Sequence, residues 1–83
     1  MMFRRLRAEP DTAGWTGEPD TAPDAPPATY RMTCEVCGAA SHTGVEFGTA
    51  LDWQLHHAAR HPAHRAYTQT VTRPWRARPR APG

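Results

Sequence analysis

Two segments of the chain alternate between two kinds of residue, which is the period of a β-strand. The first segment runs from Tyr30 to Cys34, and its apolar residues alternate with polar ones. The second covers residues 67–75, where aromatic and β-branched residues are dense and threonine recurs at every second position. Residues of these kinds favour strands over helices. The pattern therefore predicts one strand that ends at Cys34 and a later strand over residues 67–75.

A helical period separates these two segments. Three apolar residues fall on one stripe, at the spacing i, i+4 and i+7: Leu51, Leu55 and Ala58. Thr49 is the expected N-cap, because a threonine side chain can accept a hydrogen bond from an exposed backbone N–H of the first turn. Pro62 disfavours helical geometry at His61, so we expect the helix to end there.

Residues 41–47 are predicted to form a short strand before the helix, with Val45 and Phe47 on one face. The expected order is then β-β-α-β, a small α+β domain that covers residues 28–76. Its expected core consists of five large side chains, Phe47, Trp53, Tyr67, Val71 and Trp75.

The two ends of the chain lack such periods. Residues 1–7 are a basic, partly apolar start, whereas residues 8–27 are rich in proline and acidic residues and contain the sequence E-P-D-T-A twice, at 9–13 and 18–22. Segments of the latter composition do not bury enough apolar surface to fold, so we expect residues 1–27 to be a disordered leader. Trp15 is the one large apolar residue between positions 8 and 27, and we expect it to be exposed or to serve as a short partner-binding motif. Residues 77–83 are expected to be a short disordered basic tail.

A domain within a chain of only 83 residues needs a source of stability besides its hydrophobic core. A chain of this size buries only about 60% of its unfolded surface, and small domains commonly add disulfides or a metal. The two cysteines, Cys34 and Cys37, close too small a loop for a useful disulfide. The sequence shows no secretory signal and no membrane span, so we expect a cytoplasmic protein with reduced thiols. Metal binding is therefore the favoured role of the cysteines.

Five histidines follow the C-x-x-C pair, and cysteine and histidine are the residues that most often bind zinc. They are His42, His56, His57, His61 and His64. The spacer of 18 or 19 residues from Cys37 to the central pair is longer than the spacer of about 12 in DNA-reading fingers. A C-x-x-C pair followed by a helix that ends in several histidines predicts one Zn²⁺ site.

The helical turn of about 100° per residue narrows the choice of ligands. His57 and His61 flank the predicted apolar stripe and lie one turn apart, so both could reach one ion. His56 falls on the opposite side of the helix beside Arg60, and we expect it to be exposed. His64 follows Pro62 and could fold back to the same ion. His42 is a weaker rival, and the fourth ligand remains open between His61 and His64.

Four motifs of the chain, within residues 29–77, resemble a family of short, zinc-finger-like proteins from actinobacteria and their phages, whose function is not established. The motifs are C-E-V-C-G-A-A-S, D-W-Q-L-H-H-A, H-P-A-H-R-A-Y and V-T-R-P-W-R. The family pattern combines a cysteine pair, a helical W-x-L-x-H and a later histidine that precedes an aromatic residue. The resemblance implies six matching positions, Cys34, Cys37, Trp53, His57, His64 and Tyr67. It therefore implies His64 rather than His61 as the fourth zinc ligand.

Four protein ligands would fill a tetrahedral zinc site and leave no position for an activated water. The nearby acids, Glu35, Glu46 and Asp52, do not form the H-E-x-x-H motif of zinc hydrolases. We therefore expect a structural zinc site rather than an enzyme. The favoured function is a protein-interaction or regulatory module whose partner the sequence does not identify.

Nucleic-acid binding is the alternative function. All ten basic residues are arginines, and seven of them lie between positions 28 and 83 against three acids. Arginines of the C-terminal region could neutralise phosphates without reading sequence. The predicted helix surface over residues 52–60 offers only Arg60, however, whereas a base-reading helix carries more polar contact residues. The acidic leader could also neutralise the basic tail within the same chain.

Overall fold

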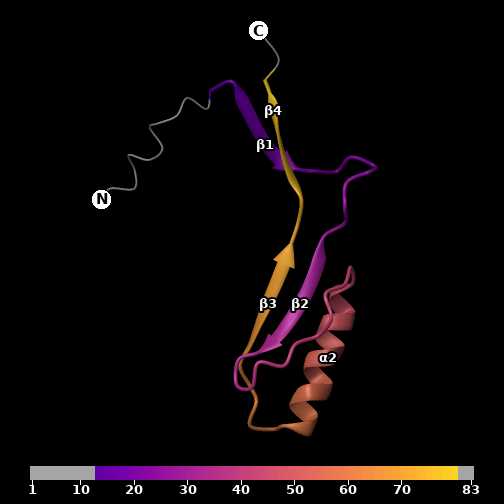
Figure 1. Ribbon diagram of the computed structural model, residues 1–83, viewed down its shortest axis with the longest axis vertical. Coiled ribbons are helices and arrows are strands. Elements are labelled where there is room, and N and C mark those ends of the chain that lie inside the picture. Colours follow the sequence, from indigo (N-terminus) through magenta and orange to yellow (C-terminus); the bar gives the residue numbers. More distant parts are fainter. Residues whose placement is uncertain (1–12, 81–83) are drawn as a thin grey trace, which may run out of the picture.

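The computed structural model describes residues 13–80 and contains four strands and one helix (Figure 1). The elements follow the order β1 (Trp15–Pro19), β2 (Thr29–Cys34), α2 (Phe47–Arg60), β3 (Tyr67–Thr72) and β4 (Trp75–Pro79). The strands form two separate antiparallel pairs, β1 with β4 and β2 with β3. The predicted α+β class is confirmed.

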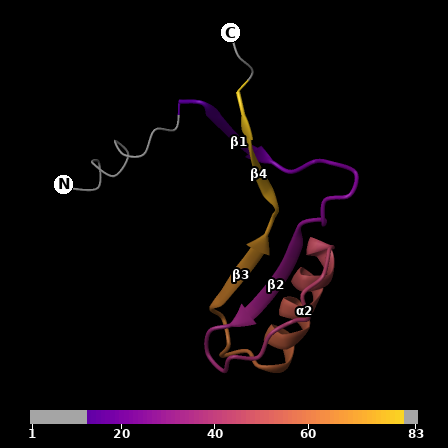
Figure 2. The same ribbon diagram turned by 45° about the horizontal axis from the view of Figure 1, so that its top comes forward.

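The pair β2–β3 and the helix form the body of the molecule. Cys34 lies opposite Tyr67 and Met32 opposite Gln69 in the antiparallel register. The helix α2 packs along β2 on one side of this sheet (Figure 2). Because side chains alternate across a strand, Met32 and Cys34 share the helix-covered face, and both are buried. The opposite face carries mainly threonines, which suit a solvated strand surface.

The buried core of the described chain is very small. Its apolar members are Met32, Cys34 and Ala50. The expected core is largely wrong, because Trp75 is 62% exposed, Val71 is 48% exposed and Phe47 is 43% exposed. Trp53 and Tyr67 are half-buried. A two-stranded sheet and a single helix share too little surface to enclose large side chains.

The helix begins earlier than predicted, and the side that it turns towards the sheet differs from the predicted apolar stripe. Its N-cap is Glu46, whose side chain makes no capping hydrogen bond, so the prediction of Thr49 as N-cap is wrong. Ala50 is buried whereas Leu55 is 57% exposed, so the predicted leucine stripe does not face the sheet. The small side chain of Ala50 allows α2 to lie close to β2. The C-terminal end is as predicted, with His61 as C-cap.

Residues 41–47 do not form the predicted strand. This segment and the residue before it contact β2 through two isolated bridges, Tyr30 with Gly44 and Thr33 with Ala40. Between them, the Ser41 hydroxyl accepts the backbone N–H of Met32 at 3.0 Å. A side chain thus occupies a place in the ladder that a backbone carbonyl would otherwise fill, which interrupts regular pairing.

The predicted last strand is divided at Pro74. The strand β3 ends at Thr72, and the chain then leaves β2 and pairs as β4 with β1. Proline has no N–H to donate to a ladder, so a change of partner is favoured at this position.

The expectation of disorder is wrong for residues 15–19, which form β1, and for residues 77–79, which belong to β4. Both strands gain their backbone hydrogen bonds from each other, which a search for local apolar periods does not detect. The expected disorder of residues 1–12 and 81–83 lies outside the described residues.

Candidate metal centre

A tight turn brings the two cysteines together at the end of β2. Cys34 is the last residue of the strand, and its carbonyl accepts the N–H of Gly38 at 2.8 Å. Its own N–H donates to the carbonyl of Ala39 at 2.8 Å. Gly38 has φ +81°, the single positive φ among the described residues. Residues with a Cβ adopt this conformation rarely, so glycine is the residue that lets the chain reverse here.

The same turn lowers the pKa of the Cys34 thiol. Burial raises the pKa of the Cys34 thiol, and the charge of Glu35 raises it further. Hydrogen bonds from the backbone N–H groups of Cys37 and Val36, together with one from the Cys37 side chain, outweigh both effects and lower the pKa of Cys34 below its ordinary value. A lowered pKa favours the thiolate, which is the form that binds metal.

The helix supplies the third donor, His57, on its sheet-facing side. Its imidazole stacks on the indole of Trp53, with ring centroids 4.8 Å apart and an interplanar angle of 18°. The ring of Tyr67 stands edge-on to it at 6.1 Å and 89°. Burial, followed by the charges of His61, His64 and Arg60, lowers the pKa of His57. The neutral imidazole, which is the metal-binding form, is therefore favoured.

His64 approaches from the loop that joins α2 to β3. Its backbone N–H donates to the carbonyl of His61 at 2.8 Å, which turns the chain back towards the helix after Pro62. The imidazole rings of His61 and His64 stack at 4.9 Å with an interplanar angle of 19°. The loop thereby directs His64 towards the cysteine turn.

The structure brings four donor atoms together, one each from Cys34, Cys37, His57 and His64, and all lie within 4.8 Å of one another. Cys34 Sγ is 3.7 Å from His64 Nδ1, and Cys37 Sγ is 3.5 Å from His57 Nε2. His57 Nε2 is 3.3 Å from His64 Nδ1. Cys34 is buried, the histidines are half-buried and Cys37 is exposed.

Three of the separations between these atoms fit a metal ion bound in a tetrahedron. Bond lengths of about 2.3 Å to sulfur and about 2.0–2.1 Å to nitrogen place tetrahedral S and N donors about 3.6 Å apart and two N donors about 3.3 Å apart. The observed distances of 3.5 and 3.7 Å, and of 3.3 Å, agree with these values. The four residues could therefore bind a single metal ion.

Comparison with known proteins identifies a family for the chain but no function. Residues 4–82 match the family described as Domain of unknown function (DUF7848). The chain belongs to this family. No curated protein and no solved structure shows significant similarity to it. Among the described residues, this DUF7848 chain has no helix that is long and apolar enough to cross a membrane.

The remaining histidines of the DUF7848 chain stand outside this group of four donors. His61 is exposed, although its ring centroid lies 4.7 Å from that of His57. His56 is exposed as predicted, and its Nδ1 lies 3.7 Å from a carboxylate oxygen of Asp52. His42 is exposed as well. The structure thus assembles the set with His64 and leaves the alternative, His61, beside it.

Tyr67 lies beside the four donor residues in the DUF7848 chain, and its hydroxyl as well as its ring faces the protein interior. Its hydroxyl is buried and has no hydrogen-bond partner among residues 13–80. Burial raises the pKa of Tyr67, and the charges of Cys34 and Cys37 raise it further. The phenol therefore stays neutral beside the two sulfurs. Its place opposite Cys34 in the β2–β3 register is the feature that sequence reasoning missed.

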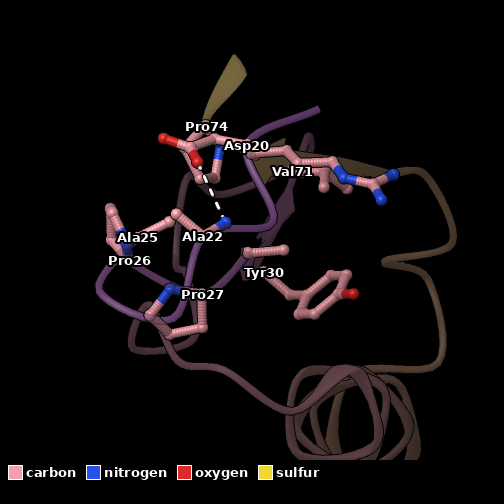
Figure 3. Close-up of a pocket in the computed structure, with 10 residues that line it drawn as sticks. Asp20, Ala22, Ala25, Pro26, Pro27, Tyr30, Val71 and Pro74 are labelled. Atoms are coloured by element: carbon pink, nitrogen blue, oxygen red, sulfur yellow. Dashed lines mark hydrogen bonds between the residues drawn. The ribbon is translucent and has the colours of Figure 1, made fainter. Parts of the chain in front are cut away.

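A cavity of about 360 Å³ lies elsewhere, at the junction between the ribbon β1–β4 and the body (Figure 3). It is lined mainly by alanines and prolines, together with Tyr30, Val71 and Arg73. Asp20 lies at its edge, where the carboxylate accepts the N–H of Ala22 at 3.1 Å. None of the four donors lines it, so the metal centre and this cavity are separate features.

Proposed function

We propose that the chain is a zinc-binding module in which Cys34, Cys37, His57 and His64 hold one structural Zn²⁺. The agreement of three S–N and N–N separations with a tetrahedral S₂N₂ site carries this proposal. Two thiolates with two imidazoles suit zinc better than the hard, oxygen-seeking cations. With all four positions supplied by the protein, the ion stabilises the fold and takes no part in hydrolysis.

The small core explains why the fold needs the ion. The buried apolar residues of the described chain are Met32, Cys34 and Ala50, too few to offset the ordering of a domain. Structural zinc sites contribute about 10–16 kcal/mol to the folding of comparable peptides. The proposed ion joins the end of β2, the helix and the loop before β3, so it ties together every element of the body.

The role that follows is a protein-interaction or regulatory module rather than an enzyme. For nucleic-acid binding, the alternative function, two of the basic side chains are already engaged. Arg78 Nε lies 3.1 Å from a carboxylate oxygen of Glu18, and Arg76 Nη1 lies 3.6 Å from one of Asp20. These ion pairs reduce the charge available for phosphates, which favours a protein partner.

The test of the zinc proposal is the metal content of the purified protein, measured by native mass spectrometry and by elemental analysis. We expect one Zn²⁺ per chain and loss of the helical circular dichroism signal after a strong chelator removes it. Cobalt substitution should give the absorption of a tetrahedral site with two thiolates. The Cys37→Ser variant should bind zinc much more weakly, while His42→Ala, which alters an exposed histidine outside the site, should bind as the wild type does.

A stoichiometry near zero would contradict the proposal, as would a spectrum that the chelator leaves unchanged. Wild-type zinc content in the Cys37→Ser variant, equal to that of His42→Ala, would show that the measured metal is bound elsewhere.

A further inference from the structure

The two strands of the ribbon β1–β4 carry the same sequence pattern. The strand β1 reads W-T-G-E-P and β4 reads W-R-A-R-P, so each has a tryptophan, a small residue and a proline at every second position. In the antiparallel register Trp15 lies opposite Pro79, Gly17 opposite Ala77, and Pro19 opposite Trp75. The ribbon therefore has an approximate two-fold axis through its central pair.

Strand alternation divides the ribbon into an apolar and a charged face. The apolar face holds the three pairs of tryptophan, small residue and proline, and we call it the tryptophan face. The other face carries Thr16, Glu18, Arg76 and Arg78. The ion pairs Arg78–Glu18 and Arg76–Asp20 agree with this division, because their partners reach each other across the charged side.

The tryptophan face is open in the described structure. Trp15 is 54% exposed and Trp75 is 62% exposed, and Gly17, Ala77 and Pro79 are exposed as well. The helix lies on β2, and the ribbon extends away from it as a single layer (Figure 1). A two-stranded ribbon without a second layer is only marginally stable in water, so an apolar face of this kind favours a partner.

We propose that the tryptophan face binds the same face of a second copy of this chain and forms a two-fold symmetric dimer. If a copy is turned over about an axis parallel to the strands, each tryptophan comes to lie over a proline. The glycine at the centre then lies over the alanine of the other copy. The face is thus complementary to itself, which is the requirement of an isologous interface.

The area of the face fits a weak dimer. An aromatic side chain offers about 150–250 Å² for burial, so two half-exposed indoles with the smaller residues supply about 400 Å² per copy. The total of about 800 Å² lies below the 1,200–2,000 Å² of standard stable interfaces. We therefore expect a dimer that dissociates on dilution.

Other occupants fit the ribbon less well. A nucleic-acid strand or an anionic membrane would need free basic groups beside the indoles. Arg76 and Arg78 lie on the opposite face, and each is paired with a carboxylate. The approximate two-fold symmetry has no role in either alternative, whereas it makes the tryptophan face complementary to the same face of a second copy.

Sedimentation equilibrium of the metal-loaded full chain over a range of concentrations tests the proposal. The wild type should associate, and its tryptophan emission should shift to shorter wavelength as it does so. Gly17→Glu places a carboxylate at the centre of the face, and an added Cβ at this position meets nothing within 4 Å. We expect its dissociation constant to rise about tenfold or more, because a charge would be buried in the interface.

The matched control is Thr16→Glu, which adds the same charge one residue away on the charged face and should change the dissociation constant little. Ala77→Glu repeats the test from the other strand and should act as Gly17→Glu does. Zinc content and helical signal should stay unchanged in all three variants, because the ribbon supplies no donor atom.

Three results would overturn the proposal. One is a wild type that stays monomeric up to a concentration on the order of 1 mM. Another is equal weakening by Gly17→Glu and Thr16→Glu. The third is a different occupant, shown either by indoles that a soluble quencher reaches only after residues 1–12 are deleted or by binding confined to anionic phospholipid vesicles.

Discussion

At the scale of single residues, the two imidazoles of the metal centre differ in how firmly the fold holds them. His57 is fixed by stacking on Trp53 and by the edge-on ring of Tyr67. His64 lies in a loop and is held by one backbone hydrogen bond to His61 and by the stacking of their rings. The helix therefore presents a preorganised donor, and the bound ion itself would fix the position of the loop.

His64→Ala and His61→Ala should separate the fourth ligand from its neighbour. We expect His64→Ala to weaken zinc binding by on the order of 100-fold, since a closed tetrahedral site loses one of its four ligands. His61→Ala should stay within about threefold of the wild type, because His61 is exposed and lies outside the group of four donors. Competition with a chromophoric chelator measures both affinities. A larger loss in His61→Ala than in His64→Ala would contradict the assignment.

The donor residues show how far local sequence reasoning reaches. Helix phase correctly separates His57 from His56, although the leucine stripe on which it relied does not face the sheet. The side of α2 that does so contains Ala50, Trp53 and His57, at the spacing i, i+3 and i+7. Weighting residues by hydrophobicity misses this side, because its most buried residue is the small Ala50. The family resemblance implies His64 rather than His61. Helix spacing alone does not predict where His64 lies, because the helix ends before Pro62.

At the scale of elements, the turn after β2 controls the metal centre. It reverses the chain within a few residues, brings Cys37 back to Cys34 and supplies the hydrogen bonds that lower the pKa of Cys34. The reversal depends on the positive φ of Gly38. The backbone conformation of Gly38 thus determines how the chain after β2 brings Cys37 close to Cys34.

Gly38→Ala should destabilise the zinc-loaded protein by about 1–2 kcal/mol, because an L-residue with a Cβ is strained at this φ. An added Cβ meets nothing within 4 Å, so the cost comes from the backbone alone. Gly48→Ala is the matched control, since Gly48 lies in α2 with similar free space. It should stabilise the protein by about 0.5–1 kcal/mol through helix propensity. Urea unfolding of both variants checks these values, and a neutral Gly38→Ala would contradict the argument.

The strands were predictable where their pattern is local. The prediction of β2 and β3 succeeds because apolar and β-branched residues alternate within each segment. The strand β1 was missed, because Gly17 and Pro19 are unfavourable in isolated strands and its partner lies far along the chain. The repeated pattern of tryptophan, small residue and proline at positions 15–19 and 75–79 was the available signal.

At the scale of the whole molecule, the ribbon depends on the body although it supplies no metal donor. Its strands lie near the two ends of the described chain, and the residues that form the body lie between them in the sequence. Once folded, the body holds Pro19 and Trp75 close enough to pair. Without it, about 55 residues would form a flexible loop, and closing such a loop costs about 3.5 kcal/mol or more. Ten residues of marginal ribbon do not offset that cost.

Removal of zinc should therefore unfold the ribbon together with the body. Hydrogen exchange followed by mass spectrometry should show that a chelator abolishes protection in α2 and, equally, in peptides that cover β1 and β4. The experiment should be run at low protein concentration, so that dimer dissociation does not contribute. In the opposite direction, Gly17→Glu should leave the protection of α2 unchanged, because the body does not rely on the ribbon. Protection of β1 and β4 that survives the chelator would show that the ribbon is stable by itself and that the dependence does not exist.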